Sequence, residues 1–248
     1  FPSFFVEKEL YLLYNFYRDD SMKKLLVLFI TLLVATGCGK ETDGEKFKRE
    51  YEKLNGEIAA SGEEYLTVDI NKNNVIKYSM VDEIIAIVQD GTGVIYLGYP
   101  ECPWCRNVVE PLLEAADSTA LETIYYLNMR DIRDRLSLDS DGNVVVEVEE
   151  KEGYYDLVEA LSAILDDYIL TSTSGETINT GKKRIYVPIV IFVKNGDIVS
   201  YHADTVATQI DPYVELTEEE NNELVNIYKE AIMKVIDLNY CSEDEERC

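Results

Sequence analysis

Apolar residues along most of this chain fall into two alternating patterns. From residue 75 onward, short continuous apolar runs alternate with stretches in which apolar residues recur every three or four positions. The continuous runs predict buried strands, and the helical spacing predicts amphipathic helices. The predicted strands are 75–79, 93–99 and 123–128, and the predicted helices are 80–89 and 103–116.

The middle of the chain interrupts this alternation. Residues 129–152 are charged and contain an Asp-rich turn followed by a β-branched run, which predicts an inserted hairpin or loop. A calcium loop is the alternative for the turn at 139–143, but the closing Glu of such a loop is missing, which favours an ordinary turn. Helical spacing then predicts a helix over 154–170, and Ser, Thr and Gly predict a polar loop over 171–183.

The last third returns to strands and ends in a helix. An apolar strand is predicted over 185–193, and Asn195-Gly196 predicts a hairpin into a strand over 197–202. Thr217 followed by Glu220 has the spacing of a capping box, which predicts a helix over 217–238.

This order of elements predicts an α/β fold. Strands that alternate with helices form a parallel sheet, and the late hairpin adds an antiparallel edge. We expect a central mixed sheet flanked by helices over 75–240, with an insertion at about 129–184. The polar segment 38–74 is predicted to be a tether, with a local helix at 46–54 and an edge strand at 65–70.

The front of the chain is predicted to be a targeting segment. Residues 22–37 begin with Met-Lys-Lys, continue with an apolar core and end in small residues, which is the layout of a secretory signal. Cys38 follows at once, as in a bacterial lipobox, so we expect lipid on Cys38 and a place on the extracytoplasmic face of a bacterial membrane. A plain secretory signal with an incidental cysteine is the alternative. Residues 1–21 are interpreted as translated upstream sequence or an artificial leader.

Charge and histidine content exclude several functions. The chain has 23 basic and 48 acidic residues, a net charge of −25, which would repel nucleic acid. His202 is the one histidine, so we expect no histidine-based metal site. No flavin or nicotinamide fingerprint is present, so we expect no cofactor.

The chemistry of the chain centres on Cys102-Pro103-Trp104-Cys105. A pair of cysteines two residues apart, between a buried strand and a helix, suits dithiol exchange, because the helix N-terminus stabilises a thiolate. Cys102 is predicted to attack and Cys105 to resolve the mixed disulfide. A structural disulfide and a zinc site are the alternatives, although zinc needs two further ligands. Trp104 is predicted to flank the thiol and meet partners, and a packed aromatic is the other interpretation.

The segments VIYLGYPECPWC and, about eighty residues later, VPIVIFVKNGDIV together resemble the thioredoxin superfamily. More narrowly, YPECPWCRN on a lipoprotein of this length looks like the thioredoxin-like lipoproteins of Gram-positive bacteria that are labelled bacteriocin transport accessory proteins. The resemblance covers about residues 75–238 and the tether. The resemblance implies a thioredoxin-like fold in which Val187-Pro188 is a cis-proline bond facing the cysteines. It further implies a substrate platform made of Pro188, Val187, Trp104, Pro103 and Tyr99.

Three departures from that family concern the thiol. Tyr96 occupies the place of the buried Asp that thioredoxins have in the preceding strand. Glu101 and Arg106 flank the cysteines, and we expect the first to raise and the second to lower the pKa of the attacking thiol.

Cys241 and Cys248 flank an acidic stretch at the C-terminal end and are expected to form a disulfide in the 241–248 tail. An unpaired or intermolecular cysteine is the alternative there. The expected function is thiol–disulfide exchange with cysteine-bearing secreted proteins or peptides, supported by a separate redox partner at the membrane. The alternative is a non-catalytic binding or export-accessory lipoprotein.

Overall fold

The computed structural model describes residues 40–236. The chain divides into two units, 1–41 and 42–248, and the fold described below belongs to the second. The predicted leader, the signal peptide, Cys38 and the tail with Cys241 and Cys248 lie outside the described residues. Within 40–236, no helix is both long and apolar enough to cross a membrane.

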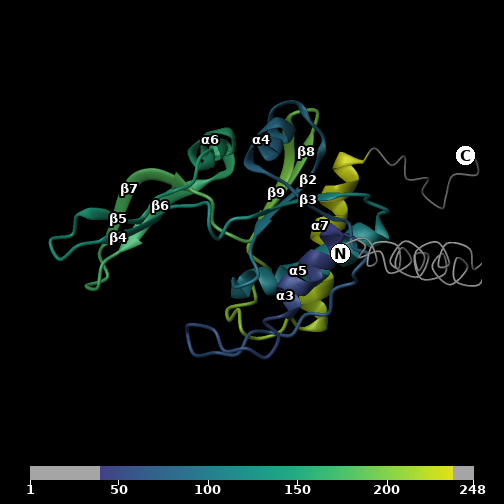
Figure 1. Ribbon diagram of the computed structural model, residues 1–248, viewed down its shortest axis with the longest axis horizontal. Coiled ribbons are helices and arrows are strands. Elements are labelled where there is room, and N and C mark those ends of the chain that lie inside the picture. The colour runs from purple at the N-terminus through teal and green to yellow at the C-terminus, as the bar shows by residue number, and fades with distance from the viewer. Residues whose placement is uncertain (1–39, 237–248) are drawn as a thin grey trace, which may run out of the picture. The chain divides into compact units, whose positions relative to one another are not determined.

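A five-stranded mixed sheet forms the centre of the described unit (Figure 1). Its strand order is β1-β3-β2-β8-β9, with β1, β3 and β2 parallel and β8 and β9 antiparallel to their neighbours. The expected α/β class, with a central mixed sheet flanked by helices, is confirmed. The strands are β1 (Ile76–Tyr78), β2 (Gly93–Gly98), β3 (Ile124–Asn128), β8 (Ile189–Lys194) and β9 (Asp197–Ala203).

The central strands of the sheet are buried on both faces. Successive side chains along one strand therefore enter different hydrophobic clusters. In β2, Val94 and Tyr96 join one hydrophobic cluster, whereas Ile95 and Leu97 join the other. Helices α3, α5 and α7 complete the first cluster, and α4 and α6 complete the second. Their bounds are α3 (Asp43–Glu52), α4 (Val81–Asp90), α5 (Pro103–Ser118), α6 (Tyr154–Ala160) and α7 (Glu218–Val235).

Local signals at two element ends act as the sequence predicts. Thr217 accepts the backbone N–H of Glu220, and the Glu220 carboxylate accepts the N–H of Thr217, so α7 begins with a capping box. Asn195 and Gly196 both have positive φ in the β8–β9 turn. A side chain at residue 196 would collide with the carbonyl oxygen of Gln89, so glycine is required there for space as well.

The segment expected to be a tether is part of the folded unit. Phe47 and Tyr51 of α3 are fully buried and pack into the first cluster, together with Val68 and Ile70. Helix α3 begins three residues earlier than predicted, because Thr42 and Glu45 form a capping box. Two aromatic residues one turn apart on a charged helix supply the buried face that the overall polarity conceals.

Residues 65–70 do not form the expected edge strand. Several of their backbone groups bond side chains instead of a neighbouring strand. Asn55 bonds both the N–H and the carbonyl of Val68, and Glu52 accepts the N–H of Ile70. The segment is therefore extended and anchored without joining the sheet.

The insertion consists of two hairpins joined by short helical turns. The β-branched run pairs as predicted, β4 with β5, across a turn in which Asp139 accepts the N–H groups of Asp141 and Asn143. The helix predicted over 154–170 ends at Ala160, and the polar loop predicted over 171–183 is mostly strand. The elements are β4 (Arg135–Leu138), β5 (Val144–Val148), a 3-10 turn (Ser162–Ile164), β6 (Asp166–Thr171) and β7 (Thr177–Arg184).

Pairing between strands overrides local pattern in the second hairpin. Residues 166–171 would extend an amphipathic helix by spacing, but they pair antiparallel with β7 and bury Tyr168. Strand β7 is rich in polar residues and has no clear apolar alternation, so its sequence resembles a loop.

Candidate functional site

Cys102 and Cys105 lie where β2 leads into α5. Cys102 is the N-cap of α5, Pro103 occupies the first helical position, and Cys105 lies in the first turn. The sulfur of Cys102 accepts the backbone N–H of Cys105 at 3.3 Å. No disulfide joins the two cysteines, and Cys102 is 5% exposed whereas Cys105 is fully buried.

The two thiols have opposite pKa shifts. The pKa of Cys102 is lowered, chiefly by its hydrogen bond with the Cys105 side chain, and further by backbone N–H groups and the charge of Arg133. Burial raises the pKa of Cys105 well above its ordinary value, and the neighbouring Cys102 raises it further. The pair therefore combines a thiol that ionises easily with one that keeps its proton, as an attacking and a resolving thiol require.

Cys102 contacts the predicted substrate platform at Val187, which is distant from it in the sequence. The Val187–Pro188 peptide bond is cis, as expected, and it precedes β8. The Cys102 thiol donates to the carbonyl oxygen of Val187 at 3.7 Å, although 85 residues separate them. Pro188 is buried and its carbonyl accepts the N–H of Asp204 at the end of β9.

Glu101 and Arg106 are engaged in interactions other than the predicted control of the thiol. The Glu101 carboxylate forms an ion pair with Arg130 at 3.0 Å. The buried Arg106 guanidinium donates to the carbonyls of Leu66, Tyr51 and Pro100 and to the side chain of Asn55. Arg106 therefore fastens the 55–66 segment to α5.

Arg133 is the cation that sequence reasoning missed. It is half-buried, donates to the Tyr99 hydroxyl at 2.8 Å and lies with its guanidinium carbon 5.1 Å from the centre of that ring. Tyr99 in turn accepts the N–H of Cys102 with its backbone carbonyl. Residue 133 lies 31 positions after Cys102, in the insertion, so no local motif signals the contact.

A group of buried tyrosines lies behind Cys105. Tyr96 shares a hydrogen bond with Tyr51 through their hydroxyls at 2.9 Å, and its ring stacks on that of Tyr126 with centroids 5.4 Å apart. Burial raises the pKa of Tyr96 and of Tyr51 far above the ordinary value, so both hydroxyls stay protonated. An interaction with the Tyr96 hydroxyl lowers the pKa of Cys105. The group behind Cys105 is therefore a neutral hydroxyl.

Gly98 makes room for that donor. A side chain at residue 98 would collide with the Tyr96 hydroxyl, so the last residue of β2 must be glycine for the hydroxyl to lie there.

Trp104 and Pro103 are both half-buried. Trp104 lines a cavity of about 600 Å³ that also includes His202, Asp204, Glu223 and Ile227. The tryptophan thus borders open space next to the cysteines, in a position suited to contact a partner.

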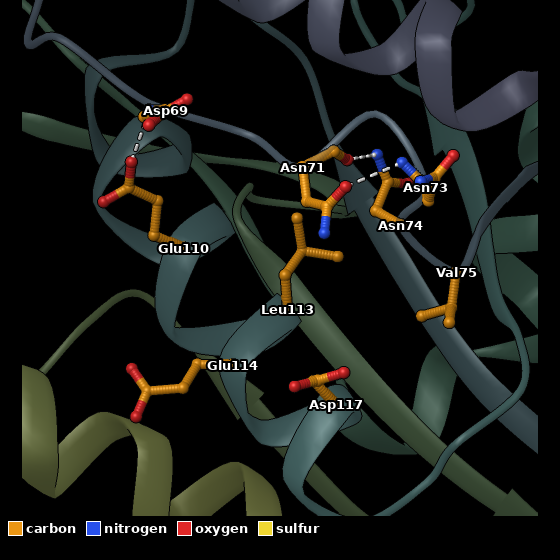
Figure 2. A pocket seen from close by; sticks show the side chains of 9 residues that line it. All are labelled: Asp69, Asn71, Asn73, Asn74, Val75, Glu110, Leu113, Glu114 and Asp117. Atoms are coloured by element: carbon orange, nitrogen blue, oxygen red, sulfur yellow. Dashed lines mark hydrogen bonds between the residues drawn. The ribbon is translucent and has the colours of Figure 1, made fainter.

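A second hollow lies away from the cysteines, along the outer side of α5 (Figure 2). Glu110, Glu114 and Asp117 come from the helix, and Asp69 comes from the facing loop. Glu110 accepts the N–H of Asp69, and burial raises the pKa of its carboxyl. No group of three possible ligands is arranged to hold a metal ion anywhere in the described residues.

No protein-family model matches the chain, and no curated protein is significantly similar to it in sequence.

Proposed function

We propose that this protein is a thiol–disulfide oxidoreductase with a thioredoxin-like fold and Cys102 as its nucleophile. The observation that carries the proposal is the position of the Cys102 sulfur. It accepts an N–H at the start of α5 and lies against the Val187 carbonyl beside the cis-proline. A structural cysteine needs neither feature. An attacking thiolate needs the N–H donor, and an extended client segment needs the backbone beside the cis-proline.

The reaction is a pair of exchanges that conserves sulfur and electrons. The Cys102 thiolate attacks one sulfur of a client disulfide, a Cys102–client disulfide forms, and the other client sulfur leaves as a thiolate. Cys105 gives up its proton and attacks Cys102, so that the Cys102–Cys105 disulfide forms and the second client thiolate leaves. Two electrons pass from the protein to the client, and the same steps run backward to oxidise a client.

The thioredoxin-like part of the proposal rests on topology and the two motifs. The β1-β3-β2-β8-β9 order, the cysteine pair at the β2–α5 junction and the cis-proline before β8 are compatible with that fold. Helix α3 and the two hairpins would be additions to it.

The proposed place of action is the outer face of a bacterial membrane. It rests on the signal-like residues 22–37 and on Cys38, which would carry the lipid anchor. The clients would be secreted proteins or peptides with cysteines, and a second membrane or extracytoplasmic protein would restore the redox state of the pair. The proposal includes no cofactor.

A non-catalytic accessory role is the second candidate. The observation in its favour is that Cys102 is 5% exposed, which limits its access to a client disulfide. A bacteriocin-related export lipoprotein could use the same fold as a docking surface.

Trapping separates the two candidates. Cys105→Ser protein is incubated with a peptide that contains one intramolecular disulfide, and the mixed disulfide is measured by mass spectrometry. We expect a stable adduct on Cys102, and no adduct with the Cys102→Ser/Cys105→Ser double variant. Equal, negligible labelling of both variants would favour the accessory role.

A further inference from the structure

A cavity of about 640 Å³ lies beside the cysteine pair, between the loop after β2 and the start of the insertion. Tyr99 and Glu101 border it on the cysteine side, and Arg133, Arg135 and Lys151 border it on the side of the insertion. Its volume is within the range of ligand sites in proteins.

The lining of this cavity reverses the charge balance of the chain. Basic residues outnumber acidic ones there by five to three, whereas the whole chain has 23 basic and 48 acidic residues. The basic residues are Arg130, Arg133, Arg135, Lys151 and Arg184, and the acidic ones are Glu101, Asp131 and Asp134.

Pairing leaves the excess charge facing the cavity. Arg130 is neutralised by Glu101, and the buried Arg184 is neutralised by Asp134, each at 3.0 Å. No acidic partner within residues 40–236 pairs with the remaining three cations, of which Arg135 and Lys151 are exposed. The lining contains one acidic residue outside these ion pairs, Asp131.

From this arrangement we infer that the cavity binds an acidic peptide segment next to the reactive cysteine of a client. Arginine holds carboxylates with two parallel hydrogen bonds, and lysine adds a point charge. The chain as a whole has a net charge of −25 and repels such a segment, so the field favours its approach to this basic hollow. A long polyanion is disfavoured by the same repulsion.

The cavity lies within reach of the sulfur chemistry. Arg133 bonds the Tyr99 hydroxyl, and the Tyr99 carbonyl accepts the N–H of Cys102. A client segment held by Arg135 and Lys151 would therefore lie near the exchange site. The inference rests on the proposed function in one respect, that the bound segment belongs to a substrate of thiol–disulfide exchange. The binding itself does not depend on exchange.

Binding is measured with cysteine-free peptides, so that it is separate from exchange. The full chain is titrated calorimetrically with Ser-flanked tetra-Glu and with the tetra-Gln peptide of the same length. We expect the acidic peptide to bind at least tenfold more tightly, and to lose most of that advantage in 500 mM NaCl. Equal affinity for the two peptides would overturn the inference.

Matched variants locate the site. Arg135→Gln/Lys151→Gln should weaken acidic binding at least tenfold, because both free cations are lost. Lys53→Gln/Lys72→Gln removes the same charge from exposed positions elsewhere and should change the affinity less than threefold. Equal effects of the two double variants would show that the peptide is attracted by charge in general, and would overturn the assignment of binding to this cavity. If acidic binding behaves as expected but no mixed disulfide ever forms, the cavity stands and the proposed function fails.

Discussion

The backbone N–H of Cys105 points at the sulfur of Cys102 across 3.3 Å. This contact links the backbone at the start of α5 to the pKa of the nucleophile, because an N–H donor stabilises a thiolate more than a thiol. The charge of Arg133 acts in the same direction.

Alkylation of the reduced protein by iodoacetamide should report this lowered pKa. The rate at Cys102 should reach half its maximum below pH 8.5, the ordinary pKa of cysteine, because a lowered pKa leaves more of the thiol ionised at any given pH. Cys105 should stay unlabelled in the folded protein, since it is buried and its pKa is raised. Labelling of Cys105 before Cys102 would contradict these roles.

Arg133→Met should move the same profile to higher pH. The variant removes the cation that favours the Cys102 thiolate, so the midpoint rises. Lys53→Met removes an equal charge from an exposed position and serves as the control, for which we expect an unchanged midpoint. Matching profiles for wild type and Arg133→Met would exclude Arg133 from control of the thiol.

Tyr96→Phe should both destabilise the protein and slow resolution. It leaves the buried Tyr51 hydroxyl without its partner, which costs about 1–3 kcal/mol of unfolding free energy. It also removes the donor near Cys105, so the Cys102–client disulfide should persist longer. Urea unfolding and stopped-flow decay of a labelled adduct measure the two effects.

Tyr228→Phe is the matched control for that change. The Tyr228 hydroxyl is buried without a hydrogen-bond partner in the described part of the chain, so its removal should be neutral or stabilising. If Tyr228→Phe slowed resolution as much as Tyr96→Phe, the effect would belong to general packing and not to the Tyr96 hydroxyl.

Arg106→Met should act on stability and leave the thiol unchanged. The guanidinium satisfies carbonyl oxygens of three residues and the Asn55 side chain, so we expect a loss of about 3 kcal/mol. The midpoint of Cys102 alkylation, taken at a urea concentration where the variant remains folded, should not move. A raised midpoint with unchanged stability would support the role in thiol ionisation that the sequence predicts for Arg106.

Phe47→Ala tests whether α3 belongs to the core. The ring is fully buried among the aromatic residues of the first cluster, and its removal should cost about 3–5 kcal/mol. Ile58→Ala removes apolar atoms from a side chain that is 64% exposed and should cost less than about 0.5 kcal/mol. A tether would show small, equal losses for both variants in urea unfolding.

The sequence predicts those parts of the site that local signals encode. A buried strand, a cysteine at an N-cap and a proline before a second strand are each readable within a few residues, and the sheet brings Cys102 to Val187. Arg133 could not be predicted, because its place depends on the path of the insertion. The aromatic pair of α3 was missed for a related reason, because its partners lie far away in the chain. The polar β7 was missed because it has no apolar alternation, although it pairs with the neighbouring β6.

The redox equilibrium of the Cys102–Cys105 pair in glutathione buffers tests the central claim most directly. The account predicts that the two thiols convert reversibly to one disulfide in a single two-electron step, with a potential between about −270 and −120 mV. A pair that stays reduced, or stays oxidised, across buffers that span this range would contradict the assignment of thiol–disulfide exchange.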